Sequence, residues 1–98
     1  MRKKEITWDD VKEELNFTPE ELAEIKLEEE LIEATIAARK KSNLSQKELG
    51  EKAGMKQPAI ARIENRTRSP QASTLIKMLY PMGYTLRVVP LEPQENTE

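Results

Sequence analysis

The sequence contains no cysteine and no histidine. Without cysteine the chain has no disulfide and no thiol nucleophile, and without either residue it lacks the usual ligands of structural zinc. Histidine is also the side chain that most readily exchanges a proton near neutral pH. Carboxylates or lysines can act as catalysts, but no spacing in this chain groups them for that purpose. We therefore predict a protein that is not an enzyme and that needs no cofactor or metal.

Long apolar runs are also missing. No stretch of 18 apolar residues occurs, and the first five residues lead directly into acidic sequence without the hydrophobic segment of a signal peptide. With 98 residues, 37% of them apolar and 35% charged, the chain has room for one modest core. We expect a helical protein that is cytoplasmic and does not bind a membrane.

The net charge of -2 conceals two halves of opposite sign. Residues 1–33 carry 12 acidic and 5 basic side chains, whereas residues 34–98 carry 11 basic and 6 acidic ones. A basic region suits a phosphate backbone, and an acidic region suits a basic protein. The alternative is that two solvated helical faces merely differ in charge.

Capping patterns divide the chain into helices. Thr7 is placed to begin a short helix that ends near Leu15, and Asp9 and Asp10 would favour its N-terminus. Thr18, Pro19 and Glu21 form a capping box with a proline in the first turn, and apolar spacing continues from Leu22 to about Ser42. The sequence therefore predicts a short and then a long N-terminal helix.

The segment from Ser45 to Asn65 has the pattern of a helix-turn-helix. Ser45 and Glu48 form a second capping box, Gly50 allows two helices to approach, and Gly54 suits a left-handed turn. The next helix is expected over Lys56–Asn65, with Ile60 and Ile63 facing inward. Its outward side chains, Gln57, Ala61 and Arg62, are followed by a basic loop and by a last helix that Pro70 opens.

The C-terminal segment is β-prone by residue type from Tyr84 to Leu91. A single strand has no partner in this chain, so we expect it to pair with its copy in a second subunit through Leu86, Val88 and Val89. The last helix near Leu79 is the second choice for that contact, and the tail could instead lie on its own core. Residues 92–98 are expected to be disordered.

The segment Ile36–Gly83 resembles the XRE or Cro-like class of phage repressors. The resemblance rests on Ala38-Arg39-Lys40, on Leu44-Ser45-Gln46-Lys47-Glu48-Leu49-Gly50, on Ala53-Gly54, and on Ile60 with Ile63-Glu64-Asn65. It implies an all-α, five-helix domain that binds a palindromic operator as a dimer. The long and short N-terminal helices would precede this domain, and the short strand would follow it.

The resemblance also implies roles for individual residues. Gln46 would hold a phosphate, while Lys56, Gln57, Ala61 and Arg62 would face base edges, with Gln57 suited to adenine and Arg62 to guanine. Arg39 and Glu64 would form a partly buried ion pair beneath the motif. Pro58 and Ala59 depart from the common pattern, because each removes a polar contact to the DNA backbone. The residues expected against phosphates are Asn65, Arg66, Thr67 and Arg68.

The acidic region is similar to HigA-type antitoxins, on the text Phe17-Thr18-Pro19-Glu20-Glu21-Leu22-Ala23-Glu24-Ile25. That likeness implies a HigB-type partner, a small basic ribonuclease toxin of the RelE-like class, held in a heterotetramer. The toxin-binding residues would be Trp8, Val11, Leu15, Phe17, Leu22 and Ile25. For the residues from Trp8 to Phe17 a second interpretation stays open, in which they fold back onto the chain's own core.

These observations divide the chain into three regions and favour one function. Residues 1–33 would bind toxin, residues 34–91 would bind DNA and dimerise, and residues 92–98 would form a tail. The favoured function is an antitoxin that represses its own operon. The alternatives are a stand-alone phage or plasmid repressor and, less favoured, an RNA- or protein-binding module.

Overall fold

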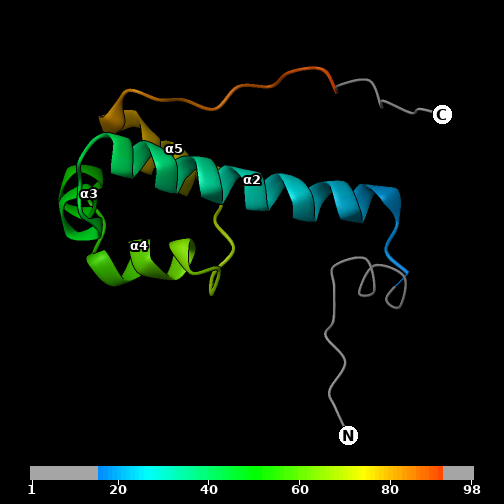
Figure 1. The fold of residues 1–98 in the computed structure, drawn as a ribbon, viewed down its shortest axis with the longest axis horizontal. Helices are drawn as coiled ribbons and strands as arrows, with labels where there is room; N and C mark the ends of the chain where they lie inside the picture. Colours follow the sequence, from blue (N-terminus) through cyan, green and yellow to red (C-terminus); the bar gives the residue numbers. More distant parts are fainter. Residues whose placement is uncertain (1–15, 92–98) are drawn as a thin grey trace, which may run out of the picture.

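The computed structural model describes residues 16–91. In that part of the chain four α-helices follow one another: α2 (Pro19–Lys41), α3 (Gln46–Ala53), α4 (Gln57–Glu64) and α5 (Ala72–Leu79). A 3₁₀ turn, η1 (Tyr80–Met82), extends α5. Figure 1 shows α2 lying across one side of a small body that α3, α4 and α5 complete.

The predicted capping boxes set the starts of α2 and α3. The Thr18 hydroxyl accepts a hydrogen bond from the Glu21 backbone N–H, while the Glu21 carboxylate accepts one from the Thr18 N–H. Ser45 and Glu48 make the same reciprocal pair at α3. These bonds satisfy N–H groups that the first turn of a helix leaves without partners.

Two glycines allow the turn between α3 and α4. Gly54 ends α3 with φ +70°, in the left-handed region that side chains with a Cβ seldom adopt. At Gly50 a Cβ atom would lie 2.5 Å from the carbonyl oxygen of Met55. The close approach of α3 to the following turn therefore requires glycine at that position.

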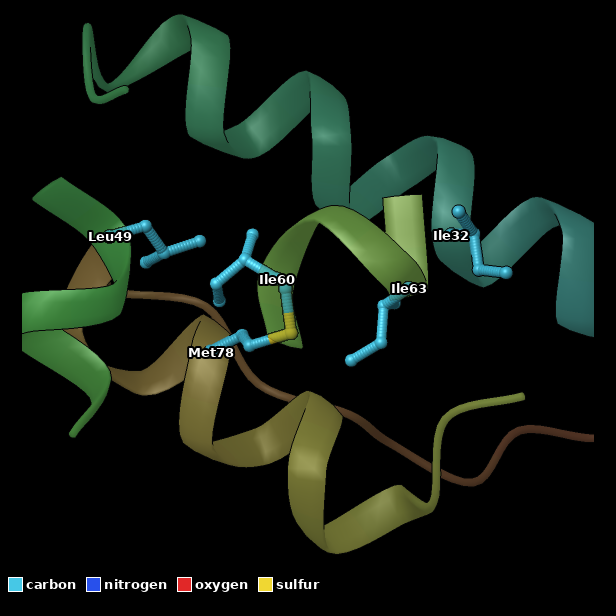
Figure 2. Close-up of a cluster of buried hydrophobic side chains, with 5 residues drawn as sticks. All are labelled: Ile32, Leu49, Ile60, Ile63 and Met78. Carbon is cyan, nitrogen blue, oxygen red and sulfur yellow. The ribbon is translucent and has the colours of Figure 1, made fainter. Parts of the chain in front are cut away.

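The core lies where the four helices meet. Figure 2 shows its side chains converging from α2, α3, α4 and α5, and each is at most 2% exposed: Ile32, Leu49, Ile60, Ile63 and Met78. Burying each side chain of this size contributes about 1.5–3 kcal/mol. The inward placement predicted for Ile60 and Ile63 is the one observed.

The prediction of a five-helix domain was wrong. The long helix is not a separate element in front of the domain, because the buried residues of α2 are Ile32, Thr35 and Ala38, all toward its C-terminal end. That end itself supplies the first helix of the bundle. The boundary expected between residues 33 and 34 falls inside α2, which continues through it without a break.

The prediction of a C-terminal strand was also wrong. Residues 84–91 follow η1 as an extended segment, and no strand occurs among residues 16–91. A β-prone composition favours extended backbone, but a strand forms only where a second strand supplies hydrogen bonds. The short N-terminal helix and the tail expected over residues 92–98 lie outside the described residues.

Candidate DNA-binding surface

The exposed face of α4 carries the side chains expected to contact bases. Ile60 and Ile63 anchor the opposite face at 0% and 2% exposure, so α4 is held to the core along one side. Gln57 and Arg62 are exposed and Ala61 is half-buried. Lys56 is exposed too, but it lies just before α4 as its N-cap rather than inside the helix. A short helix with one fixed and one polar face fits a major groove.

A chain of hydrogen bonds orients the side chain of Gln57. The Gln46 amide N–H donates to Glu64 Oε1 at 2.9 Å, and the Gln57 amide N–H donates to Gln46 Oε1 at 2.7 Å. An ionised carboxylate only accepts, so the Gln46 amide must turn its N–H toward Glu64, which leaves Gln46 Oε1 to accept from Gln57. Gln57 is left with one N–H donor and its Oε1 acceptor, the pair that adenine N7 and N6 require.

Arg39 and Glu64, expected as an ion pair, lie together beneath the motif. Arg39 Nε donates to Glu64 Oε2 at 2.7 Å and Arg39 Nη2 to Glu64 Oε1 at 2.9 Å. Their side chains are only 12% and 8% exposed. A third bond, from Arg39 Nη1 to the Leu44 carbonyl at 2.8 Å, ties the end of α2 to the start of α3.

The ion pair holds Glu64 in its charged form. Burial alone would raise the pKa of the Glu64 carboxyl, but the hydrogen bonds from Arg39 and Gln46 outweigh it and leave that pKa below its usual value. The hydrogen bond to Glu64 likewise raises the pKa of Arg39. The Glu64 carboxylate, to which the hydrogen-bonded pair Gln46 and Gln57 is attached, therefore stays ionised at neutral pH.

The loop after α4 does not present all four predicted phosphate-binding residues freely. Asn65 Oδ1 accepts hydrogen bonds from the backbone N–H and the hydroxyl of Thr67, so the Asn65 side chain closes the turn. Arg66 has φ +64° and turns its guanidinium toward α2, where it pairs with Glu29 and Glu33. Arg68 is exposed and makes no ion pair within residues 16–91.

Three residues at this surface were not predicted from the sequence. Glu29 and Glu33 lie 37 and 33 positions before Arg66, and no local pattern links residues so far apart. The hydrogen bond with Arg66 lowers the pKa of Glu29 below its usual value. The third is Lys47, which lines an open groove between α3 and α4 beside Gln46 and Gln57. Its place in the first turn of α3, next to Gln46, was the signal that could have found it.

The residues expected to bind toxin are only partly described. Trp8, Val11 and Leu15 lie outside the described residues. Phe17 and Leu22 are half-buried, whereas Ile25 is 37% exposed on α2. Of the residues expected at the dimer contact, Leu86 is half-buried, while Val88 and Val89 are 98% and 66% exposed.

Neither a membrane span nor a metal site occurs among the described residues. None of the described helices is long and apolar enough to cross a membrane. Within residues 16–91 no group of three or more carboxylates is placed to hold a metal ion. A helix held to the core along one face, an oriented glutamine on its exposed face and nearby cations are the features of a DNA-binding protein of the helix-turn-helix class.

Comparison with known proteins agrees with this class. The helix-turn-helix family model matches residues 36–89, and the chain belongs to this XRE-like family. An HTH-type transcriptional regulator of Haemophilus influenzae is 43% identical over 84 residues, which are 86% of this chain and 85% of the relative. A chain in a solved toxin–antitoxin module from Streptococcus pneumoniae is 42% identical, with a TM-score of 0.65, and the match covers 90% of this chain and 97% of that one.

Proposed function

We propose that this protein is an antitoxin that binds a basic toxin through its acidic N-terminal region and represses its own operon through α4. The observation that supports the proposal most strongly is that the two ends of α2 have different surroundings. One end of this helix completes the DNA-binding domain, whereas the other end projects beyond it (Figure 1). The likeness to a chain of a toxin–antitoxin module over nearly its whole length supports the same function.

The projecting end of α2 has the chemistry of a docking surface for a cationic protein. From Pro19 to Glu33 it carries seven glutamates and one lysine. Ile25 and Leu27 are 37% and 55% exposed among these carboxylates. Such a surface combines electrostatic steering with apolar anchors. A ribonuclease toxin that binds RNA must present cations, so a HigB-like enzyme of the RelE class is the partner we propose, inhibited by occupation of its surface.

The DNA-binding half acts as a dimer in this proposal. Two copies of α4 would read the two half-sites of a palindromic operator. The exposed side chains of Val88 and Val89, with Leu86, are the proposed contact between subunits. Two antitoxin chains and two toxins would then form a heterotetramer.

The test separates the two halves. The full chain and a chain that begins at residue 31 are each titrated with a promoter fragment and each co-expressed with the product of the neighbouring gene. Both should bind the promoter, with an affinity that falls steeply with salt, but only the full chain should neutralise the toxin. Neutralisation by the shorter chain would move the toxin site elsewhere. A full chain that binds its promoter but not the product of the neighbouring gene would be a stand-alone repressor. A full chain that shows no salt-dependent binding to duplex DNA would exclude both the antitoxin that represses its operon and the stand-alone repressor.

A further inference from the structure

The guanidinium of Arg66 is almost fully occupied by groups of its own chain. Its Nε donates to Glu29 Oε1 at 3.1 Å and its Nη2 to Glu29 Oε2 at 2.5 Å, while Nη2 also donates to Glu33. Its Nη1 donates to the carbonyl oxygen of Glu64 at 2.5 Å. An arginine has five N–H donors, and these bonds use four. Little of Arg66 is left for a phosphate.

The carboxylates that hold Arg66 belong to the acidic projecting helix. Two carboxylates face one guanidinium, and Glu28 adds a third by accepting a hydrogen bond from the Ser69 hydroxyl at 2.6 Å. The loop that was expected to meet phosphates therefore has local negative charge beside it. Arg68 and Arg62, by contrast, make no ion pair within the described residues.

This contact is accessible and can be exchanged. The side chains of Glu29 and Glu33 are 50% and 62% exposed, and that of Arg66 is 36% exposed. Exposed ion pairs are individually weak, because water competes for both partners. A cationic protein on α2 can take over the same carboxylates, and Arg66 can then turn to a phosphate.

We propose that Glu29 and Glu33 keep Arg66 from the operator backbone, and that a basic partner bound to α2 releases it, so that partner binding strengthens operator binding. The second part of this statement rests on the proposed function. The first part concerns the chain alone. Each can be tested separately.

The first experiment uses the full chain and a fragment of its own promoter over a series of salt concentrations. Glu29→Gln with Glu33→Gln is compared with Glu24→Gln with Glu30→Gln, which removes the same charge from the same helix without touching the loop. One new phosphate contact steepens the slope of log K against log salt by about 0.9 per subunit. At 0.1 M salt this corresponds to roughly eightfold tighter binding per subunit.

Arg66→Gln is then introduced both into the parent chain and into the variant with Glu29→Gln and Glu33→Gln. It should weaken operator binding strongly in the Glu29→Gln, Glu33→Gln background and only slightly in the parent chain. Equal slopes in the two double variants would overturn the restraint, because only overall charge would then matter. An equal effect of Arg66→Gln in both backgrounds would overturn it as well. Far-UV circular dichroism melts confirm that each variant used is folded.

The second experiment uses the complex with the product of the neighbouring gene. The complex should bind the promoter more tightly than the free chain, and Arg66→Gln should remove that gain. A complex whose gain survives Arg66→Gln overturns the release of Arg66 but leaves the antitoxin function intact. Failure to form any complex refutes the proposed function and with it the role of a partner, while the salt titration still decides whether Glu29 and Glu33 restrain Arg66.

Discussion

Glu64→Ala should be one of the most destabilising single changes on this surface. It removes both carboxylate bonds of Arg39, at 2.7 and 2.9 Å, and leaves a guanidinium that is only 12% exposed with the Leu44 carbonyl as its remaining partner. Removing one member of a buried pair costs about 3–5 kcal/mol. Because Arg39 keeps one acceptor and some access to water, we expect about 3 kcal/mol. That is a large part of the roughly 5–15 kcal/mol that stabilises a domain.

The assay is urea unfolding followed by far-UV circular dichroism at one fixed protein concentration, since the proposed dimer would make the stability depend on concentration. The control is the double variant Arg39→Met with Glu64→Leu, which removes both charges and fills the space. It should regain at least half of the loss, because the cost of the single change comes from an unpaired charge. A loss below about 1 kcal/mol for Glu64→Ala would show that the pair behaves as an exposed one. A double variant as unstable as the sum of the two single variants would show that the cost does not come from an unpaired charge.

Three further predictions concern base recognition by Arg62, the turn at Gly50 and stability in acid. Arg62→Ala should cost about 1–3 kcal/mol of operator binding at one base position, which a titration of single-base operator variants measures. Lys47→Ala is the control variant in the same titration. An equal loss of affinity for every operator variant would show that Arg62 contacts only phosphate. Gly50→Ala should destabilise the fold by about 1–3 kcal/mol, because its Cβ would lie 2.5 Å from the Met55 carbonyl oxygen. The neighbouring change Glu51→Ala should have little effect in the same urea assay. A Gly50→Ala variant as stable as the parent chain would mean that the turn opens freely. Acid should weaken the fold through Glu64, because the pKa of this carboxyl is lower in the folded than in the unfolded state. Its contribution to the stability of the fold is present above the unfolded pKa of about 4.3. That contribution is lost as the pH falls through the lowered pKa of the folded state. The urea midpoint should therefore fall less between pH 6 and pH 3 in Glu64→Gln than in the parent chain, and parallel curves would contradict that assignment.

Local signals in the sequence predicted most of the motif. The capping boxes at Thr18 and Ser45, the left-handed turn at Gly54 and the inward isoleucines of α4 each depend on residues within one or two turns of helix. Such interactions are decided by neighbours in the chain, so a single sequence contains them. The boundary of α4 shifted by one residue at each end, since Lys56 and Asn65 are its caps.

Long-range contacts could not be predicted from local signals, and the pair Arg39–Glu64, 25 positions apart, was expected only from the family resemblance. The pairing of Arg66 with Glu29 and Glu33 depends on where α2 crosses the loop after α4, and no local spacing encodes that crossing. The strand expected near Val88 failed for a related reason, because residue type favours an extended backbone without supplying a partner strand. The count of helices failed because one long helix both projects from the domain and completes its core.

The most direct test of the proposed antitoxin function is co-expression of the full chain with the product of the neighbouring gene, followed by co-purification and a growth-rescue assay. We expect a stable complex in which the basic product is inactive and growth is restored. A chain that purifies alone and leaves growth arrested, while it still binds its own promoter, would contradict the antitoxin function and leave a repressor whose acidic helix serves another purpose.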